Sequence, residues 1–239
     1  MRRATLWIVT LVCLVISLQA HSLEHLQVNT GFDEPVLSVY RAILKEVGKD
    51  TGVDIDVEFV SAERSLQLVA AGVDDAECCR VKSIVEKEYP GLVAVEPSFI
   101  TMRFVAFTKQ ADIHIKSWDD LLPYSVATVS GWKIHVNNLG RIKHNNALVL
   151  DSPYSLFKML DDERIDVALL GDMNGMYELK RLGITDYKMQ SPALAEVPLY
   201  LFLHQNKAYL APRLRESLEK IKVSGQLDTV IKRALESAL

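Results

Sequence analysis

Cysteine is scarce in this sequence. Only three cysteines occur among 239 residues: Cys13 near the N-terminus and the adjacent pair Cys78 and Cys79. So small a number excludes a disulfide-stapled scaffold, and a chain of this length can bury a core large enough to fold without one. The pair has no second Cys or His cluster that would complete a zinc site. Two interpretations remain: a vicinal disulfide, or, as the pattern favours, one inward-facing and one outward-facing residue of a strand.

The sequence also lacks the short motifs of common enzymes and an excess of positive charge. It contains no GxSxG, P-loop, GxGxxG or HExxH segment. Its net charge of -4 argues against nucleic acid and anionic membrane as partners. We expect no metal and no cofactor, because the acidic groups lack calcium-loop spacing and are interpreted as solvated carboxylates. These groups are Asp74-Asp75-Glu77, Asp119-Asp120 and Asp161-Asp162-Glu163.

Long apolar runs are absent except at the N-terminus. There Arg2 and Arg3 precede the apolar run Leu6–Leu18, and small residues follow at Ala20 and Ser22. This order is typical of a secretory signal peptide, residues 1–22, with cleavage after Ser22 or, alternatively, after Ala20. An uncleaved anchor is the other interpretation, although the run is short for a membrane span. Losing the two arginines takes the net charge from -4 to -6, and we expect an exported, periplasmic, monomeric protein that does not insert into the membrane.

Strand and helix patterns alternate along the rest of the chain, which predicts an α/β fold with parallel strands covered on both faces. The expected strands are Leu26–Thr30, Val53–Val60, Asp74–Val81, Ser125–Val129, Ala147–Leu150 and Asp166–Leu170. The expected helices are Val36–Gly48, Ala62–Ala71, Lys82–Glu88, Trp132–Leu139, one from Pro153, Met173–Leu182, Leu210–Val223 and Leu227–Ala238.

Two long extended passages, Leu92–Thr108 and Tyr187–Leu203, interrupt this alternation. If both cross between lobes, the chain forms a discontinuous first lobe, residues 23–106 and 190–239, and a second lobe, residues 107–189. Two lobes place a cleft between them, where strand C-termini and helix N-termini converge.

The predicted second lobe contains the stretch Ser117–Trp132. A buried strand there runs through a tight Ser130-Gly131 turn into a helix, which leaves backbone N–H groups facing outward at a positive dipole end. Such a turn suits an anionic group of a small ligand, although an ordinary strand-to-helix connection has the same appearance. Trp118, at the start of this stretch, falls in a polar turn.

Several segments, taken in order, resemble the periplasmic solute-binding proteins of the amino-acid type, family 3 of the bacterial extracellular binding proteins. The resemblance covers essentially all of Leu23–Leu239. It is carried by Glu63–Gly72 with Val73-Asp74-Asp75, Ser117–Leu121, Val126–Trp132, Leu160–Leu170 and Leu218–Leu235. It implies a type II periplasmic-binding-protein fold, with two lobes joined by two extended hinge crossings that close on a small polar solute.

The resemblance also implies roles for individual residues. In amino-acid binders an arginine after a first-lobe strand takes the ligand carboxylate, and Arg80 lies in that region. Asp172 is the nearest match to the second-lobe acid that takes the ammonium, one residue later than the common spacing. The Ser/Thr-x-x-x-Arg pattern usual before the arginine is absent, and Glu77-Cys78-Cys79 stands in its place.

Most of the candidate ligand-binding residues have a plainer interpretation. Arg80 is a surface arginine in that interpretation, Asp172 is a helix cap, and the aromatic rings are packing residues. Arg64 opens a helix that is expected to face the cleft. The candidates are Phe32, Arg64, Arg80, Ser130, Trp132 and Asp172.

Three functions fit these observations. The first is a binding protein that delivers an amino acid or related carboxylate to an ABC transporter. The second is a sensory module for a membrane receptor. The third is an enzyme on the same fold, similar to periplasmic dehydratases of prephenate-like acids such as cyclohexadienyl dehydratase. An enzyme needs an acid or base in the cleft, and the sequence offers only carboxylates that cannot be placed there and His135.

Overall fold

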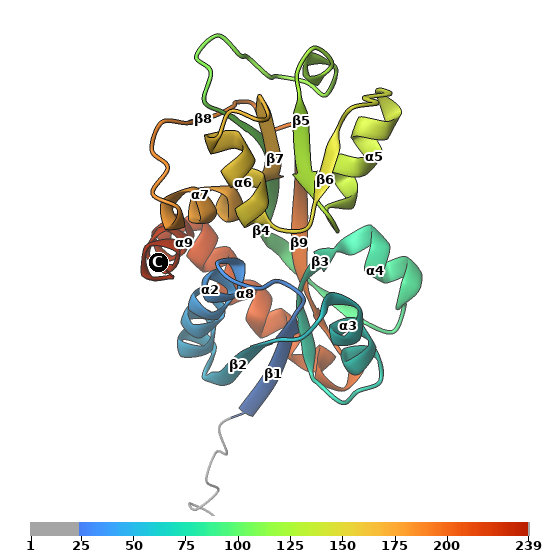
Figure 1. Cartoon of the computed structure of the whole chain (residues 1–239). Coiled ribbons are helices and arrows are strands. Elements are labelled where there is room, and N and C mark those ends of the chain that lie inside the picture. The colour runs from blue at the N-terminus through green and yellow to red at the C-terminus, as the bar shows by residue number, and fades with distance from the viewer. Residues whose placement is uncertain (1–23, 239) are drawn as a thin grey trace, which may run out of the picture.

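Strands and helices alternate along the chain as the sequence predicts. The computed structural model describes residues 24–238, so the signal peptide predicted for residues 1–22 lies outside the described part. The elements form two groups (Figure 1). The lower group holds β1–β3, α2–α4, α8 and α9, the upper group holds β5–β8 and α5–α7, and the long strands β4 and β9 run between them.

The observed elements match the expected ones to within a few residues. The strands are β1 Glu24–Thr30, β2 Val53–Phe59, β3 Ala76–Val81, β4 Val93–Thr108, β5 Val126–Val129, β6 Leu148–Leu150, β7 Val167–Gly171, β8 Lys188–Met189 and β9 Ala195–Leu203. The α-helices are α2 Val36–Thr51, α3 Ala62–Ala70, α4 Lys82–Glu88, α5 Lys133–Arg141, α6 Pro153–Asp161, α7 Asp172–Arg181, α8 Ala211–Val223 and α9 Gln226–Ser237. Two short 3₁₀ helices, η1 Asp119–Leu121 and η2 Gln205–Leu210, complete the list.

The strands form one mixed sheet in the order β2-β1-β3-β9-β4-β7-β5-β6, with β8 paired to β4. The expected parallel pairing holds within each group, where β1 pairs with β2 and β3, and β5 pairs with β6 and β7. The long strands differ: β4 and β9 pair antiparallel to each other because the chain crosses upward in one and returns downward in the other. Each therefore also pairs antiparallel with a shorter strand, β9 with β3 and β4 with β7.

The two long strands are the structural link between the groups. β4 pairs with β9 from Val93 to Phe104 and with β7 from Phe104 to Phe107. β9 pairs with β3 through Leu199–Leu203. Both strands thus contribute to both groups, as expected for two extended crossings. The lobe limits at residues 106 and 190 stay a prediction.

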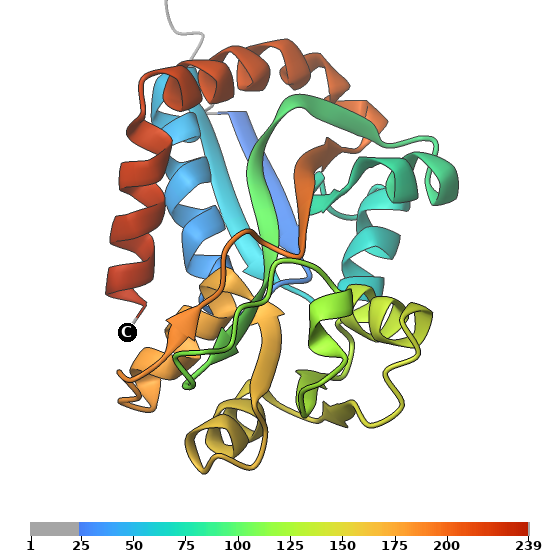
Figure 2. The same cartoon turned by 90° about the horizontal axis from the view of Figure 1, so that it is seen from above.

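Helices cover both faces of the lower sheet region. Figure 2 shows α2 and α9 on one side, α3 and α4 on the other, and α8 running across the top of the view. Helix α2 buries an apolar stripe that includes Val39, Ile43 and Val47, at the spacing of one helical face. Trp132, Ile134 and Met173 of the upper group pack against the lower group's core, so the two groups are in contact. Among the described helices, none has the length and apolarity needed to cross a membrane.

Candidate functional site

Four of the six predicted site residues lie at or shortly after the ends of strands that meet at the junction of the two groups. Phe32 lies just after β1 and Arg80 near the end of β3, both in the lower group. Trp132 follows β5 through the Ser130-Gly131 turn, and Asp172 follows β7, both in the upper group. Parallel strands of one sheet end at the same edge, so each pair is brought together by its own sheet region (Figure 1).

Arg80 is held by side chains of the lower group. Its Nε lies 2.7 Å from Glu77 Oε1, and its Nη2 donates a hydrogen bond of 3.0 Å to Ser65 Oγ on α3. Its guanidinium carbon lies 5.7 Å from the centroid of the Phe32 ring, a cation–π distance. The Arg80 side chain is only 16% exposed. The plainer interpretation of Arg80 as a free surface arginine therefore does not describe it.

Glu77 corrects the expectation that its acidic group is solvated. The Glu77 side chain is 0% exposed, because β3 lies between β1 and β9 in the sheet and α3 packs against it. Burial raises the pKa of this carboxyl, and the neighbouring Arg80 guanidinium opposes that shift. Asp74 and Asp75 also have structural roles, since they accept hydrogen bonds from the Asn29 side chain and the Gln27 backbone, respectively.

The cysteine pair forms a disulfide, and both residues are 0% exposed. The favoured expectation of one inward and one outward residue is therefore wrong. Its physical reason is visible in the pairing of β3 with β9, where Cys78 pairs with Leu201 and Arg80 with Tyr200. Cys79 is the extra residue of a β-bulge, and in a bulge the regular alternation of side chains is lost.

Trp132 fills the junction from the upper group. Its half-buried ring packs edge-on against Phe104, with centroids 5.7 Å apart, and stacks on His135 at 5.6 Å. Gly171 permits this placement, because a Cβ there would lie 2.7 Å from the Trp132 ring. Trp132 thus belongs both to the core and to the junction, which combines the two interpretations that the sequence allowed.

His135 lies beneath Trp132. It is 0% exposed, and its Nδ1 lies 2.7 Å from Thr128 Oγ1. Burial lowers the pKa of His135 to about 3, which keeps the imidazole neutral. Trp118 is also buried, and its ring centroid is 6.0 Å from that of His135. Trp118 does stand at the polar turn that the sequence indicates, directly before η1, but its indole is folded inward.

Asp172 has a different set of partners from Arg80. Its Oδ1 accepts a 2.8 Å hydrogen bond from the Met173 backbone, and its Oδ2 lies 3.8 Å from Arg103 on β4. Burial raises the pKa of Asp172, and Arg103 opposes that shift. Asp172 and Arg103 line a pocket of about 400 Å³ together with residues of α9. The N-cap position that the sequence allowed for Asp172 is taken by Gly171, and Asp172 is instead the first residue of α7, with an ion pair that the sequence did not indicate.

The remaining predicted residues are solvent-facing. Arg64 is exposed on the first turn of α3, next to Ser65, and Ser130 is exposed in the turn after β5, where its N–H donates to the Leu150 carbonyl. Sequence reasoning missed the groups that hold the site: Glu77, Ser65, Phe104 and Arg103. Only the three-residue spacing of Glu77 and Arg80 gave a signal, and in a regular strand that spacing places two residues on opposite faces.

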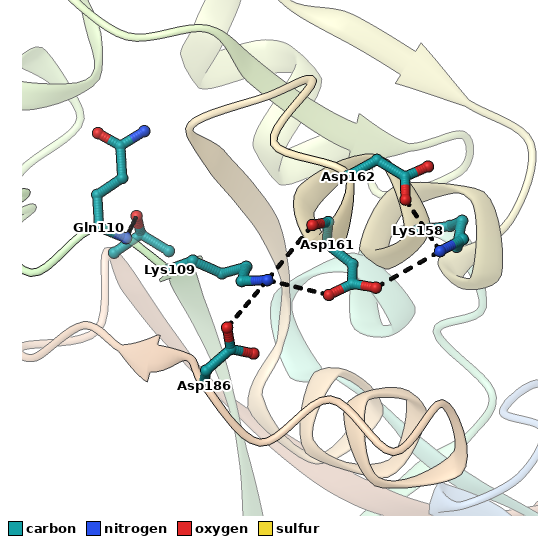
Figure 3. A network of polar contacts seen from close by, with 7 residues as sticks. Lys109, Gln110, Lys158, Asp161, Asp162 and Asp186 are labelled. Carbon is teal, nitrogen blue, oxygen red and sulfur yellow. Dashed lines mark hydrogen bonds and ion pairs between the residues drawn. The ribbon is translucent and has the colours of Figure 1, made fainter.

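The acidic group at Asp161-Asp162 belongs to an ion-pair network in the upper group. Lys109 reaches Asp161 and Asp186, each at 3.0 Å, and Lys158 approaches Asp161 and Asp162 (Figure 3). Lys109 holds the pKa of Asp161 below its usual range. Residues 24–238 contain no cluster of three His, Cys, Asp or Glu side chains arranged to hold a metal ion.

No family model and no curated protein sequence matches this chain. Solved structures do match over most of its length. The GluR0 ligand-binding core in complex with L-glutamate superposes with a TM-score of 0.70 at 12% identity, covering 90% of this chain and 99% of that one. The amino-acid ABC transporter substrate-binding protein AbpA from Streptococcus pneumoniae, bound to L-arginine, gives 0.63 at 16% identity, covering 90% and 95%.

A histidine kinase sensor domain with similarity to periplasmic binding proteins also matches. Its TM-score is 0.65 at 16% identity, and the match covers 88% of this chain and 96% of that chain. At these identities the likeness concerns the fold. The chain therefore has the two-lobed fold shared by periplasmic binding proteins and by sensor domains similar to them.

Proposed function

We propose that this chain binds a small carboxylate-bearing solute, an amino acid or a close relative, between its two groups of elements. The observation that carries the proposal is Arg80, a nearly buried arginine at the end of β3 that Glu77, Ser65 and Phe32 hold in place. A guanidinium matches a carboxylate in shape and charge, and a fixed one loses little conformational entropy when it binds. Neighbouring structures of the same fold carry L-glutamate and L-arginine.

The groups around Arg80 supply the other requirements of such a site. Phe32 and Trp132 offer ring faces to the non-polar part of a solute from the two sides of the junction. The Ser130-Gly131 turn offers the hydroxyl of the exposed Ser130 to a second polar group of the solute, since the Ser130 N–H already donates to the Leu150 carbonyl. Asp172 keeps its proposed role toward the solute ammonium only if closure moves it from Arg103, whose Nη1 is 3.8 Å away.

Binding is favoured over catalysis by the state of the titratable side chains. His135, the imidazole candidate for acid–base work, is 0% exposed beneath Trp132. A general acid or base must come within hydrogen-bonding reach of the reacting proton. We therefore propose a binding protein, with Phe32, Arg80, Ser130, Trp132 and Asp172 as its ligand-facing candidates. Arg64, which is exposed on the first turn of α3, is left out of this set.

Delivery of the solute to an ABC transporter is the first physiological role that we propose. The sensing alternative is supported by two neighbours, the histidine kinase sensor domain and the BvgS VFT2 domain of Bordetella pertussis, which has a TM-score of 0.63 at 17% identity. Both roles are consistent with export to the periplasm after removal of residues 1–22. In both, the closed form is what a membrane partner would recognise.

A thermal-shift experiment tests the proposal. The exported form is heated with L-glutamate, L-glutamine or L-arginine, and with agmatine, which is L-arginine without its carboxylate. A solute at about 100 times its dissociation constant stabilises by about 2.7 kcal/mol, which raises the melting temperature by about 5–10 °C for a chain of this size. We expect such a rise with at least one amino acid. If L-arginine is the solute, agmatine should give none.

An outcome in which no amino acid raises the melting temperature contradicts the proposal. An equal rise with L-arginine and agmatine contradicts the assignment of Arg80 to a carboxylate. Arg64→Ala is the matched control, because this exposed arginine stands next to Ser65 and its removal should leave the fold intact.

A further inference from the structure

Strand β3 is irregular at the point where it presents Arg80. Its pairing with β9 proceeds regularly from Ala76 opposite Leu203 to Cys78 opposite Leu201. It then skips one residue, and Arg80 stands opposite Tyr200. Cys79 is the skipped residue, and its sulfur is bonded to that of Cys78. The disulfide and the bulge are thus the same feature of the strand.

The bulge decides which face of the sheet Arg80 occupies. Residues opposite each other on paired strands share a face. Glu77 stands opposite Phe202 and Arg80 opposite Tyr200, two residues apart on β9, so Glu77 and Arg80 lie on the same face. If Cys79 paired regularly with Tyr200 instead of being bulged out, Arg80 would stand opposite Leu199 and point into the core on the other face. A one-residue shift moves every following side chain of a strand in this way.

The two cysteine side chains also fail to alternate between the two faces of the strand. Cys78 and Cys79 both belong to the lower group's core, together with Leu201 and Leu199. In a regular strand, adjacent side chains point to opposite faces and their sulfurs cannot meet. The sulfurs meet only while the bulge exists, so the bond excludes the regular pairing. Regular pairing would place Arg80 away from Glu77, Ser65 and Phe32.

We propose that the Cys78–Cys79 disulfide is a positioning element of the solute site, which locks the bulge that holds Arg80 beside Glu77. This inference rests on the proposed function for its effect on solute affinity, but its effect on Arg80 is independent of any solute. A dithiol reductant reverses the lock: it transfers two electrons and two protons to the disulfide, leaves two protein thiols and becomes a cyclic disulfide itself.

The redox state of the pair is the first quantity to measure. The exported form is denatured in an alkylating reagent and weighed by intact mass spectrometry, with and without prior reduction. We expect no alkylation of the unreduced protein and two alkylated cysteines after reduction. Two alkylated cysteines without reduction would overturn the proposal.

The position of Arg80 is then read from its Nε–H signal in a ¹⁵N-arginine-labelled sample, assigned with Arg80→Lys. In the oxidised protein this proton lies against the Glu77 carboxylate, 2.7 Å from Nε to Oε1, and should exchange slowly with water. We expect the slow exchange to be lost in Glu77→Gln, in Cys78→Ser/Cys79→Ser and in the reduced wild type. Arg41 is the internal control, because its Nε donates to the Val57 carbonyl at 2.9 Å on other elements and should be unaffected.

Solute binding gives the functional arm, with L-glutamate, L-glutamine and L-arginine as the probes. The double serine variant should bind about tenfold more weakly or worse than wild type. In the Glu77→Gln background the two serine substitutions should cause little further loss of affinity, because the effects of residues that act through one contact are non-additive. Far-UV circular dichroism and the Arg41 signal confirm that the variants fold. If the double serine variant misfolds, the reduced wild type takes its place.

The outcomes separate this proposal from the proposed function. A protein that binds none of the probes contradicts the proposed function, while the Arg80 signal still decides whether the disulfide positions this residue. An Arg80 signal that is unchanged by reduction and by the serine substitutions overturns the positioning role. If the double serine substitution weakens binding equally in wild type and in Glu77→Gln, the disulfide does not act on affinity through the Glu77–Arg80 ion pair, and that part of the proposal is overturned.

Discussion

At the scale of single residues, the site depends on a buried ion pair whose members the sequence places three apart. Glu77 is 0% exposed, and the Arg80 side chain is 16% exposed. Removing one member of such a pair leaves an uncompensated buried charge, which costs more than the pair itself contributes. Arg80 is therefore expected to be fixed before any solute arrives. Arg64 precedes Ser65, a partner of Arg80, on α3, but unlike Arg80 it is exposed.

Glu77 gives a pH prediction whose sign follows from its burial. The pKa of this carboxyl is higher in the folded protein than in the unfolded chain, for which the reference value is 4.5. The folded state then binds more protons than the unfolded state in the window above about 4.5, so the contribution of Glu77 to stability falls as pH rises through that window. Thermal unfolding of wild type and Glu77→Gln is measured from about pH 4 to pH 8.

We expect the melting temperature of wild type to fall relative to Glu77→Gln as the pH rises from about 4.5, and the difference to level off above the folded-state pKa. Glu219→Gln, an exposed carboxylate on α8, serves as the control and should show no such trend. A difference between wild type and Glu77→Gln that stays constant with pH, or grows in the other direction, would contradict the burial of this group.

At the scale of elements, local patterns predicted nearly every helix and strand but not the irregularities. Ser152 and Pro153 indicated the start of α6, and the Ser152 side chain does accept from the Ser155 N–H at 3.2 Å. The Cys79 bulge was invisible, because strand register is set by pairing with β9, which lies more than a hundred residues away. The antiparallel pairing of β4 and β9 was missed for the same reason. Of the candidate site, the positions after strands were predictable, whereas the buried partners of Arg80 and Asp172 were not.

Alanine substitutions at two helical glycines, one tightly packed and one in open space, test the packing of α7. A Cβ at Gly175 in α7 would lie 2.3 Å from the Phe107 ring, whereas a Cβ at Gly140 in α5 meets nothing within 4 Å. Both substitutions gain helix propensity. Gly175→Ala should nevertheless destabilise by about 1–3 kcal/mol through overpacking, and Gly140→Ala should stabilise by about 0.5–1 kcal/mol.

Chemical denaturation of both variants measures these free energies directly. Equal effects of the two substitutions would show that α7 does not pack on β4 as closely as the structure places it. The comparison is useful because α7 carries Asp172 in its first turn. The packing of α7 against Phe107 therefore positions Asp172 at the upper side of the junction.

At the scale of the whole molecule, the two groups of elements are joined by β4 and β9 and touch through Trp132, Ile134 and Met173. In the proposed function, closure on a solute would be a population shift, driven by contacts that exist only in the closed form. Trp132 and Trp118 are the tryptophans of the described residues. Trp132 is half-buried at the junction, and Trp118 is buried in the upper group's core.

Tryptophan emission should therefore report closure through Trp132. Its surroundings change when the groups move together, whereas those of Trp118 move with it as one body. We expect Trp118→Phe to keep the fluorescence change that a bound amino acid produces and Trp132→Phe to lose most of it. A change that survives in Trp132→Phe would place the solute away from the Ser130–Trp132 turn.

The most direct measurement of the central claim is the affinity of Arg80→Ala. Isothermal titration with whichever of L-glutamate, L-glutamine and L-arginine stabilises the wild type gives the binding free energy of wild type, Arg80→Ala and the exposed control Arg64→Ala. If Arg80 holds the solute carboxylate, Arg80→Ala should lose about 2–4 kcal/mol of binding free energy and Arg64→Ala should lose less than about 1 kcal/mol, with both variants folded. An Arg80→Ala variant that binds as tightly as wild type would contradict the account.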